Sequence, residues 1–281
     1  MDLTQINQTK IFACNMRKNI IEEIFSAQSG HPGGSLSCTD ILAVLYNVEM
    51  RIDPKNPQDP DRDRFVLSKG HCAPALYAAL AQRGYFPEEE LKRFRSADSF
   101  LQGHPSMRSV PGVDMSTGSL GQGISAAVGM AMAGKLDKKE YRVFAILGDG
   151  ELQEGQVWEA SMAAAHYKLD NLTAFVDHNG LQIDGEIRKV MNPEVVSDKF
   201  RAFGWNVIDI DGHNVSAIHK AIQQAKLVKD MPTMIVCATH KGQGVSFMKD
   251  EAGWHGSAPK QEQRDIAVCE IETVLTALEE E

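Results

Sequence analysis

The sequence predicts an α/β fold with a doubly wound, mostly parallel sheet and helices on both faces. Short apolar runs rich in β-branched and aromatic residues recur in the second half of the chain, and helical segments separate them. Strands that alternate with helices pair in parallel through right-handed crossovers. A Gly148-Asp149-Gly150 turn follows the first run, which places a carboxylate at the carboxyl edge of the sheet, where open parallel sheets bind ligands.

The first part of the chain is expected to be mainly helical. Apolar residues recur at helical spacing in residues 8–28 and 38–50, and a glycine-rich turn at 29–35 separates them. Residues 52–64 (IDPKNPQDPDRDR) are rich in proline, aspartate and asparagine, so a surface connection is expected there. Two further helices are expected at residues 73–83 and 88–95.

The remaining elements follow the strand pattern. Buried strands appear as short apolar runs that end in turn residues. Four are expected, at residues 141–147 (YRVFAIL), 172–177 (LTAFVD), 205–210 and 233–238 (TMIVCA). Helices are expected between them at 154–167 and 216–226, and residues 261–281 are expected to form a surface helix that ends in an acidic tail.

The composition excludes several classes of protein. The chain of 281 residues is 43 % hydrophobic and 24 % charged, which is ordinary for a folded globular protein. Its net charge of −9 argues against nucleic-acid binding, which needs a basic face. The 5 cysteines form no CxxC pair, so neither a disulfide framework nor a zinc cluster is indicated. Without a signal-peptide pattern or an apolar run of membrane-spanning length, a cytoplasmic protein is expected.

Two consecutive strand ends carry oxygen-bearing side chains, Asp149 and Asn179. Such ligands suit a hard cation such as Mg²⁺ or Ca²⁺. Gly150 lets the backbone approach a ligand, and the following helix N-terminus favours anions. A glycine–aspartate–glycine turn alone is common, and an aspartate there is more often a helix cap. Taken with Asn179, the pattern predicts a metal-bridged diphosphate.

The segment from Gly148 to Asn179, followed by LQIDG, resembles the signature of thiamine-diphosphate enzymes. The resemblance implies thiamine diphosphate as cofactor, held through Mg²⁺ or Ca²⁺. It also implies three metal ligands from this chain: the side chains of Asp149 and Asn179 and the main-chain carbonyl of Leu181.

Four histidines next to glycine narrow the choice among families of thiamine-diphosphate enzymes. They lie in SGHPGGS, LSKGH, GHPS and WHGSAP, and they are His31, His71, His104 and His255. With STGSLGQG at 116–123 and KGQG at 241–244, these motifs resemble the transketolase family from about residue 15 to residue 259. The resemblance implies that residues 1–281 form a single thiamine-diphosphate-binding domain.

The family resemblance assigns roles to individual residues. His31, His104 and His255 are implied to act in catalysis, by hydrogen bonding to the sugar hydroxyls and facing the substrate. Histidines near their ordinary pKa can bind hydroxyls and move protons. The implied cofactor-binding residues are His71 and His255 at the diphosphate, Gly118 through its carbonyl, Leu120 beside the thiazolium ring, Gly150 through its N–H, the metal ligands Asp149, Asn179 and Leu181, Glu154 between the two active sites of a dimer, and Lys241 in a closing loop.

The resemblance also implies a missing half. In the family, a second domain supplies the glutamate that activates the cofactor's pyrimidine ring, and this chain stops before that domain. The start at Met1 and the terminal helix favour a natural subunit over a fragment. We therefore expect a C-terminal transketolase subunit carrying the pyrimidine domain as partner, in a heterotetramer with two copies of each chain. Together they would transfer a two-carbon ketol unit from a ketose phosphate to an aldose phosphate.

Three alternatives stay open at this point. An E1α subunit of a 2-oxo-acid dehydrogenase would share the metal motif but not SGHPGGS and GHPS. A 1-deoxyxylulose-5-phosphate synthase is disfavoured by the same histidines and by the chain length. A non-catalytic homologue is disfavoured because Asp149, Asn179 and the four histidines are all present. Ser119 and Glu151 depart from the family pattern, and neither is expected to touch the chemistry.

Overall fold

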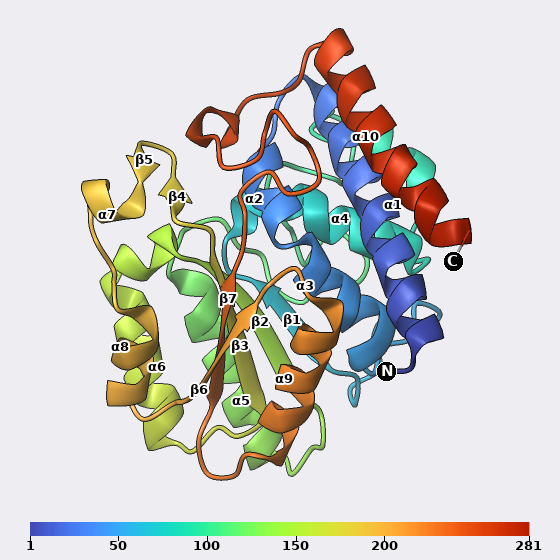
Figure 1. Cartoon of the computed structure of the whole chain (residues 1–281). Coiled ribbons are helices and arrows are strands. Elements are labelled where there is room, and N and C mark those ends of the chain that lie inside the picture. Colours follow the sequence, from blue (N-terminus) through green and yellow to red (C-terminus); the bar gives the residue numbers. More distant parts are fainter. Residues whose placement is uncertain (281) are drawn as a thin grey trace.

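A five-stranded parallel sheet forms the centre of the computed structural model, which describes residues 1–280 (Figure 1). The strand order is β1-β2-β3-β7-β6, so the last strand along the chain lies between β3 and β6. The strands are β1 (Arg64–Leu67), β2 (Val143–Gly148), β3 (Leu172–His178), β6 (Asn206–Asp211) and β7 (Thr233–Ala238). The predicted α/β fold is therefore confirmed.

The register of the sheet aligns the carboxyl ends of β2, β3 and β7. Gly148 of β2 pairs with Asp177 of β3, and Asp177 pairs with Cys237 of β7. Because all five strands run in parallel, the segments that follow β1, β2, β3 and β7 leave from the same edge. This carboxyl edge is at the top of the sheet in Figure 1.

Helices cover both faces of the sheet because alternate strand residues are buried on opposite sides. Val143, Ala145 and Leu147 belong to one core, whereas Phe144 and Ile146 belong to the other. The first core is closed by α5 (Gln122–Leu136), α6 (Gly155–His166) and α8 (Val196–Ala202). The second is closed by α1 (Leu3–Ala27), α3 (Thr39–Val44), α4 (Ala73–Gln82), α9 (Val215–Leu227) and α10 (Gln261–Glu280).

Shorter elements complete the chain. They are α2 (Pro32–Ser37), η1 (Leu45–Glu49), η2 (Gly70–Cys72), η3 (Glu88–Arg93), η4 (Gly150–Gln153), β4 (Leu181–Gln182), β5 (Gly185–Glu186), α7 (Ile187–Val190) and η5 (Ala252–Trp254). The β4–β5 hairpin stands apart from the main sheet, beside its carboxyl edge (Figure 1). Within residues 1–280, no helix has both the length and the apolar character needed to cross a membrane.

The structure confirms the four predicted strands and corrects other predictions. The expected turn at 29–35 gives way to α2 at Pro32, a residue that favours a first helical turn. The expected helix at 88–95 is the 3₁₀ helix η3. Two elements have no clear sequence pattern: β1, whose four residues are too few for one, and α5, whose small side chains show little polar contrast. Position 281 of the expected acidic tail lies outside the described residues.

Candidate functional site

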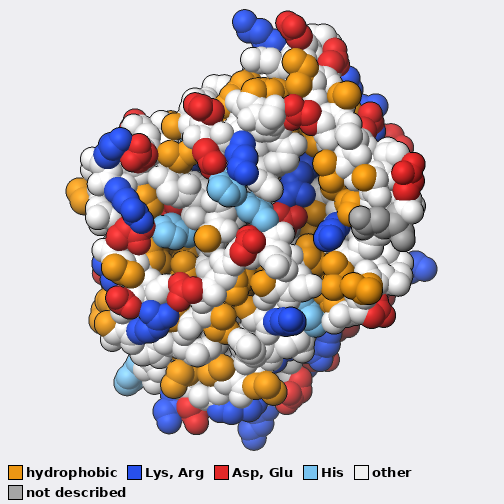
Figure 2. Space-filling view, viewed as in Figure 1, with side chains coloured by type: hydrophobic (Ala, Val, Ile, Leu, Met, Phe, Trp, Pro, Cys, Tyr) orange, Lys and Arg blue, Asp and Glu red, His pale blue; other side chains and the backbone are white. Residues whose placement is uncertain are grey.

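A cavity of about 320 Å³ opens at the carboxyl edge of the sheet. Figure 2 shows one face of the molecule, on which several histidine side chains lie among acidic and basic ones. Every residue predicted for the site except His104 lines the cavity. These lining residues are His31, His71, Gly118, Leu120, Asp149, Gly150, Glu154, Asn179, Leu181, Lys241 and His255.

Three histidines from distant parts of the chain form a cluster in this cavity. The ring centroid of His31 is 5.2 Å from that of His71 and 5.4 Å from that of His255, and those of His71 and His255 are 5.3 Å apart. His31 immediately precedes Pro32 at the start of α2, His71 lies in η2, and His255 follows η5.

Burial keeps two of these imidazoles neutral. Burial, and then the nearby His71, lower the pKa of His31 to about 4. Burial, followed by Lys241 and His71, lowers the pKa of His255 to about 3. His31 Nδ1 is buried without a hydrogen-bond partner among residues 1–280. Buried polar atoms are normally paired, so this nitrogen is available to a ligand.

His104 lies next to the cavity but does not line it. A Cβ atom on Gly118 would be only 2.9 Å from His104 Cδ2, so the ring packs against this glycine. Tyr77 donates its hydroxyl to the His104 carbonyl at 3.1 Å, which fixes the loop. Burial, then His71 and Arg95, lower the pKa of His104.

Arg95 connects the two loops that carry His31 and His104. Its Nη1 donates to Ser29 Oγ at 2.7 Å, two residues before His31. On its other side, a Cβ on Gly103 would meet the guanidinium group at 2.8 to 2.9 Å. The backbone of Arg95 is left-handed, with φ of 61°, and its N–H donates to the Leu101 carbonyl at 2.8 Å. The side chain therefore packs between both loops.

The predicted metal ligands come from adjacent strand ends. Asp149 is buried after β2, with its carboxylate accepting from the N–H groups of Gly150 at 2.8 Å and Gly180 at 2.6 Å. Asn179 Oδ1 accepts from the Leu181 N–H at 3.1 Å, and Asn179 Nδ2 donates to Asp177 Oδ2 at 3.1 Å. Burial, and then the nearby Asp177, raise the pKa of Asp149 to about 6. A cation bound beside Asp149 would stabilise its charged form.

A lysine ammonium occupies one side of this oxygen-rich pocket. Lys241 is buried, and its Nζ lies 3.2 Å from the Leu181 carbonyl oxygen and 2.9 Å from His255 Nδ1. Nζ is thus a cation at a carbonyl that was predicted to bind a metal ion. Together with the carboxylate of Asp149 and the amide oxygen of Asn179, this carbonyl forms an all-oxygen set that fits Mg²⁺ or Ca²⁺.

A buried ion pair lies beneath the metal ligands. Lys69 Nζ is 2.5 Å from Asp177 Oδ2, and their side chains are 2 % and 0 % exposed. Lys69 also donates to the Gly34 carbonyl at 2.8 Å. Asp177 accepts from Thr239 Oγ1 at 2.6 Å and from the Ser37 hydroxyl. Burial alone would raise the pKa of Asp177, but Lys69 and these hydroxyls hold it below its ordinary value.

Neither this ion pair nor the approach of Glu151 to the site was predicted from the sequence. Both Lys69 and Glu151 line the cavity. The available signal was position, because Lys69 follows β1 by two residues and Asp177 lies at the end of β3. Glu154, at the N-terminus of α6, lines the same cavity and is exposed at its rim.

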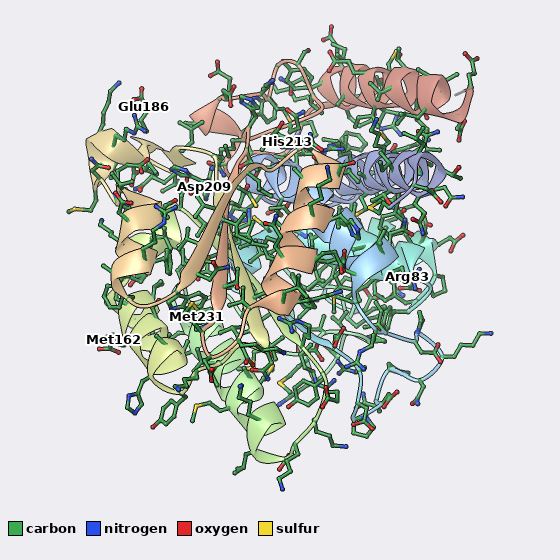
Figure 3. The ribbon with its side chains drawn as sticks, turned by 60° about the horizontal axis from the view of Figure 1, so that its bottom comes forward. Arg83, Met162, Glu186, Asp209, His213 and Met231 are labelled. Atoms are coloured by element: carbon green, nitrogen blue, oxygen red, sulfur yellow. The ribbon has the colours of Figure 1, made fainter. Side chains whose placement is uncertain are left out.

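A second network fixes the loop that carries Lys241. His213, which precedes α9 (Figure 3), lies 2.8 Å from Asp40 through Nδ1 and accepts from the His240 N–H at 2.8 Å through Nε2. Asp40 also pairs with Arg17 at 2.5 Å, and Arg17 Nε donates to the Gln243 carbonyl at 3.3 Å. Hydrogen bonds that lead back to α1 and α3 therefore hold residues on both sides of Lys241.

Comparison with known proteins gives a family and two close relatives. The family model for the transketolase, thiamine diphosphate binding domain matches residues 8–271. The chain is 49 % identical over 257 residues to the 6-deoxy-6-sulfo-D-fructose transketolase subunit SqwG of Clostridium sp. (strain MSTE9), covering 92 % of this chain and 94 % of that protein. It is 41 % identical over 277 residues to an apulose-4-phosphate transketolase subunit of Phocaeicola vulgatus, covering 99 % and 98 %.

Longer proteins match over less than half of their own length. Human transketolase is 42 % identical over 271 residues, which is 96 % of this chain but 43 % of that protein. Among solved structures, a transketolase variant from Pichia stipitis superposes with a TM-score of 0.87 at 31 % identity, covering 98 % of this chain and 46 % of that one. The transketolase of Campylobacter jejuni gives a TM-score of 0.85 at 30 % identity, covering 100 % and 48 %.

Proposed function

The chain belongs to the transketolase family, and from that premise we propose that it is the thiamine-diphosphate-binding subunit of a two-chain transketolase. It would transfer a two-carbon ketol unit from a ketose to an aldose together with a partner. The observation that carries this proposal is the meeting of His31, His71 and His255 with Asp149 and Lys241 in a single cavity.

The cavity suits a diphosphate bound through a metal ion. Asp149, Asn179 and the Leu181 carbonyl would hold Mg²⁺ or Ca²⁺, and Lys241 would leave this carbonyl for a diphosphate oxygen. The Gly150 N–H and His71 would contact the diphosphate. Gly118 and Leu120 would contact the rings of the cofactor. Glu154, at the exposed rim, would face the second active site of the dimer.

Thiamine diphosphate, when bound, supplies the electron sink for cleaving the carbon–carbon bond next to a ketose carbonyl. The chain's own part is to bind and orient the sugar and to move protons. His31 and His255 are neutral near pH 7, so each can both accept and donate a hydrogen bond to a hydroxyl. We propose that His104 acts with them on the sugar hydroxyls from the far side of Gly118.

The substrates would be sugars with an anionic group at the end away from the carbonyl. The names of the two subunit relatives include a sulfonated ketose and a sugar phosphate, and both carry such a group. We propose ketose and aldose phosphates as the substrate class, with the partner supplying the groups that bind the phosphate.

The partner would be a C-terminal transketolase subunit that carries the pyrimidine domain and its activating glutamate. Support comes from length: the chain spans 94 % and 98 % of relatives that are named as subunits, but 43 % of human transketolase. We propose two copies of each chain, with residues 1–281 as one cofactor-binding domain.

The test is co-purification of the tagged chain from its native host with thiamine diphosphate and Mg²⁺, followed by a ketol-transfer assay. The proposal predicts a stoichiometric partner and activity that neither chain shows alone. Native mass spectrometry should give two copies of each chain. Activity of this chain without any partner, or a stoichiometric partner without ketol transfer to any sugar phosphate, would contradict it.

A further inference from the structure

Glu151 is a buried carboxylate in the wall of the cavity, next to the predicted metal ligand Asp149. Its side chain is 2 % exposed, and it belongs to the short η4 helix that follows β2. The inference below rests on the proposed function, because the loops that Glu151 contacts are cofactor-binding loops only if that proposal holds.

The carboxylate accepts three hydrogen bonds, two from other segments of the chain and one from the last residue of the strand that precedes it, β2. Oε1 accepts from Ser68 Oγ at 2.5 Å and from the Gly121 N–H at 2.9 Å. Oε2 accepts from the Gly148 N–H at 3.0 Å. The three partners are neutral donors that lie 83, 30 and 3 residues away along the chain.

Each of these segments carries residues of the candidate site. The loop after β1 begins at Ser68 and includes His71, and the loop that ends at Gly121 includes Gly118 and Leu120. The loop after β2 carries Asp149 and Gly150. A single side chain therefore joins its own segment, which would hold the metal, to the two loops that would hold the diphosphate and the rings.

The loops touch each other so closely that small shifts matter. A Cβ on Gly70 would lie 2.7 Å from the Gly118 nitrogen, and a Cβ on Gly123 would lie 2.6 Å from Ser68 Oγ. Contact of this kind leaves room for only short side chains, such as those of Ser68 and Thr117, between the loops. Hydrogen bonds to Glu151 restrain their relative position.

We propose that Glu151 is a positioning residue that locks these three segments in register before the cofactor binds. A carboxylate suits this task because both of its oxygens accept, and all three partners can donate at once. In a glutamine, one of these oxygens becomes an NH₂ group, which would face a main-chain N–H in either orientation. Glutamine therefore keeps the shape of the side chain but cannot accept all three hydrogen bonds.

The first measurement is hydrogen exchange on the full chain without cofactor, comparing wild type with Glu151→Gln. Exchange should be about ten- to a hundredfold faster in peptides covering residues 66–72 and 116–123, since bonds to a charged acceptor are lost. Peptides from α1 and α9 should not change. Ser68→Ala, which keeps the carboxylate and two of its bonds, should give a smaller increase in the same peptides.

Glu49→Gln is the matched control. Glu49 is also a buried glutamate, but it bonds Gln223 and Lys226 far from the cavity. It should lower the melting temperature without changing exchange in the cofactor loops. Equal exchange in those loops for Glu151→Gln and wild type would overturn the proposal.

A thiamine diphosphate titration at saturating Mg²⁺, on the chain in complex with its co-purified partner, separates positioning from general stability. Glu151→Gln should weaken binding about ten- to a hundredfold, whereas Glu49→Gln should bind as wild type. Wild-type affinity in Glu151→Gln would overturn the positioning role. Failure of the wild-type complex to bind would instead refute the proposed function, and the exchange result would still decide whether Glu151 restrains the loops.

Discussion

Among the described residues, Lys69 is the only basic residue that forms an ion pair with Asp177. Replacing it by methionine would leave a buried carboxylate without an opposite charge. The two groups are 2.5 Å apart, with side chains 2 % and 0 % exposed. Breaking such a pair from one side costs about 3–5 kcal/mol, because the remaining charge stays buried. Methionine fills a similar volume, so little of the effect should come from a cavity.

The remaining partners of Asp177 reduce this loss. Thr239 Oγ1 stays at 2.6 Å and Asn179 Nδ2 at 3.1 Å, and the Ser37 hydroxyl also donates. We therefore expect Lys69→Met to lower the free energy of unfolding by about 3–4 kcal/mol, towards the lower end of that range. At about 2–4 °C per kcal/mol, the melting temperature should fall by about 6–16 °C.

Urea unfolding followed by circular dichroism measures this effect, with two comparisons. Lys139→Met breaks an exposed pair with Asp61 and should leave the midpoint unchanged, because surface pairs contribute little. Lys69→Met combined with Asp177→Asn should recover part of the loss, since no buried charge then remains. If Lys69→Met changed the unfolding midpoint as little as Lys139→Met, the buried pair would not stabilise the fold as argued.

Three further predictions concern the cavity. Asp149→Ala should abolish Mg²⁺-dependent binding of thiamine diphosphate in a calorimetric titration, whereas unchanged binding would remove it from the metal site. The pKa of His31 is about 4 in the folded chain against an ordinary 6.5, so the unfolded chain binds more protons between these values and stability should fall as pH drops from about 6.5 towards 4. His31→Asn should make that decline shallower in pH-dependent unfolding, and an identical slope would contradict the lowered pKa. Arg95→Ala frees Ser29 Oγ and the loop of His104, so the KM for the donor ketose should rise about tenfold while the melting temperature changes little; an unchanged KM would show that Arg95 does not position these loops.

Sequence patterns predict the core of this fold well because strand and turn signals are local. The run at 233–238 coincides with β7 at both ends, and the predicted strand at 172–177 ends one residue before β3 does. Asp149 and Asn179 could be assigned to one site from the sequence, because they follow consecutive strands of one sheet. The glycine-flanked histidines pointed to a single site, and the structure brings three of them together.

Other features depend on contacts between distant residues. Lys69 and Asp177 are 108 residues apart, and neither position reveals that the other will be buried beside it. Glu151 was predicted to be a departure from the family pattern without consequence for the chemistry. Its partners are two backbone N–H groups and a hydroxyl, which no sequence motif reveals. His104 was expected at the site, and its ring packs against Gly118 without lining the cavity. The catalytic roles of these residues stay predictions.

The position of β7 in the sheet matters during synthesis on the ribosome. β3 is complete at residue 178, yet its neighbour β7 begins only at residue 233. At about 5–20 residues per second, the nascent chain would keep the edge of β3 unpaired for about 3–11 s. An uncovered edge is a template for pairing with another chain. Slow translation between these two strands should therefore lower the yield of soluble subunit, even though the finished molecule is unaffected.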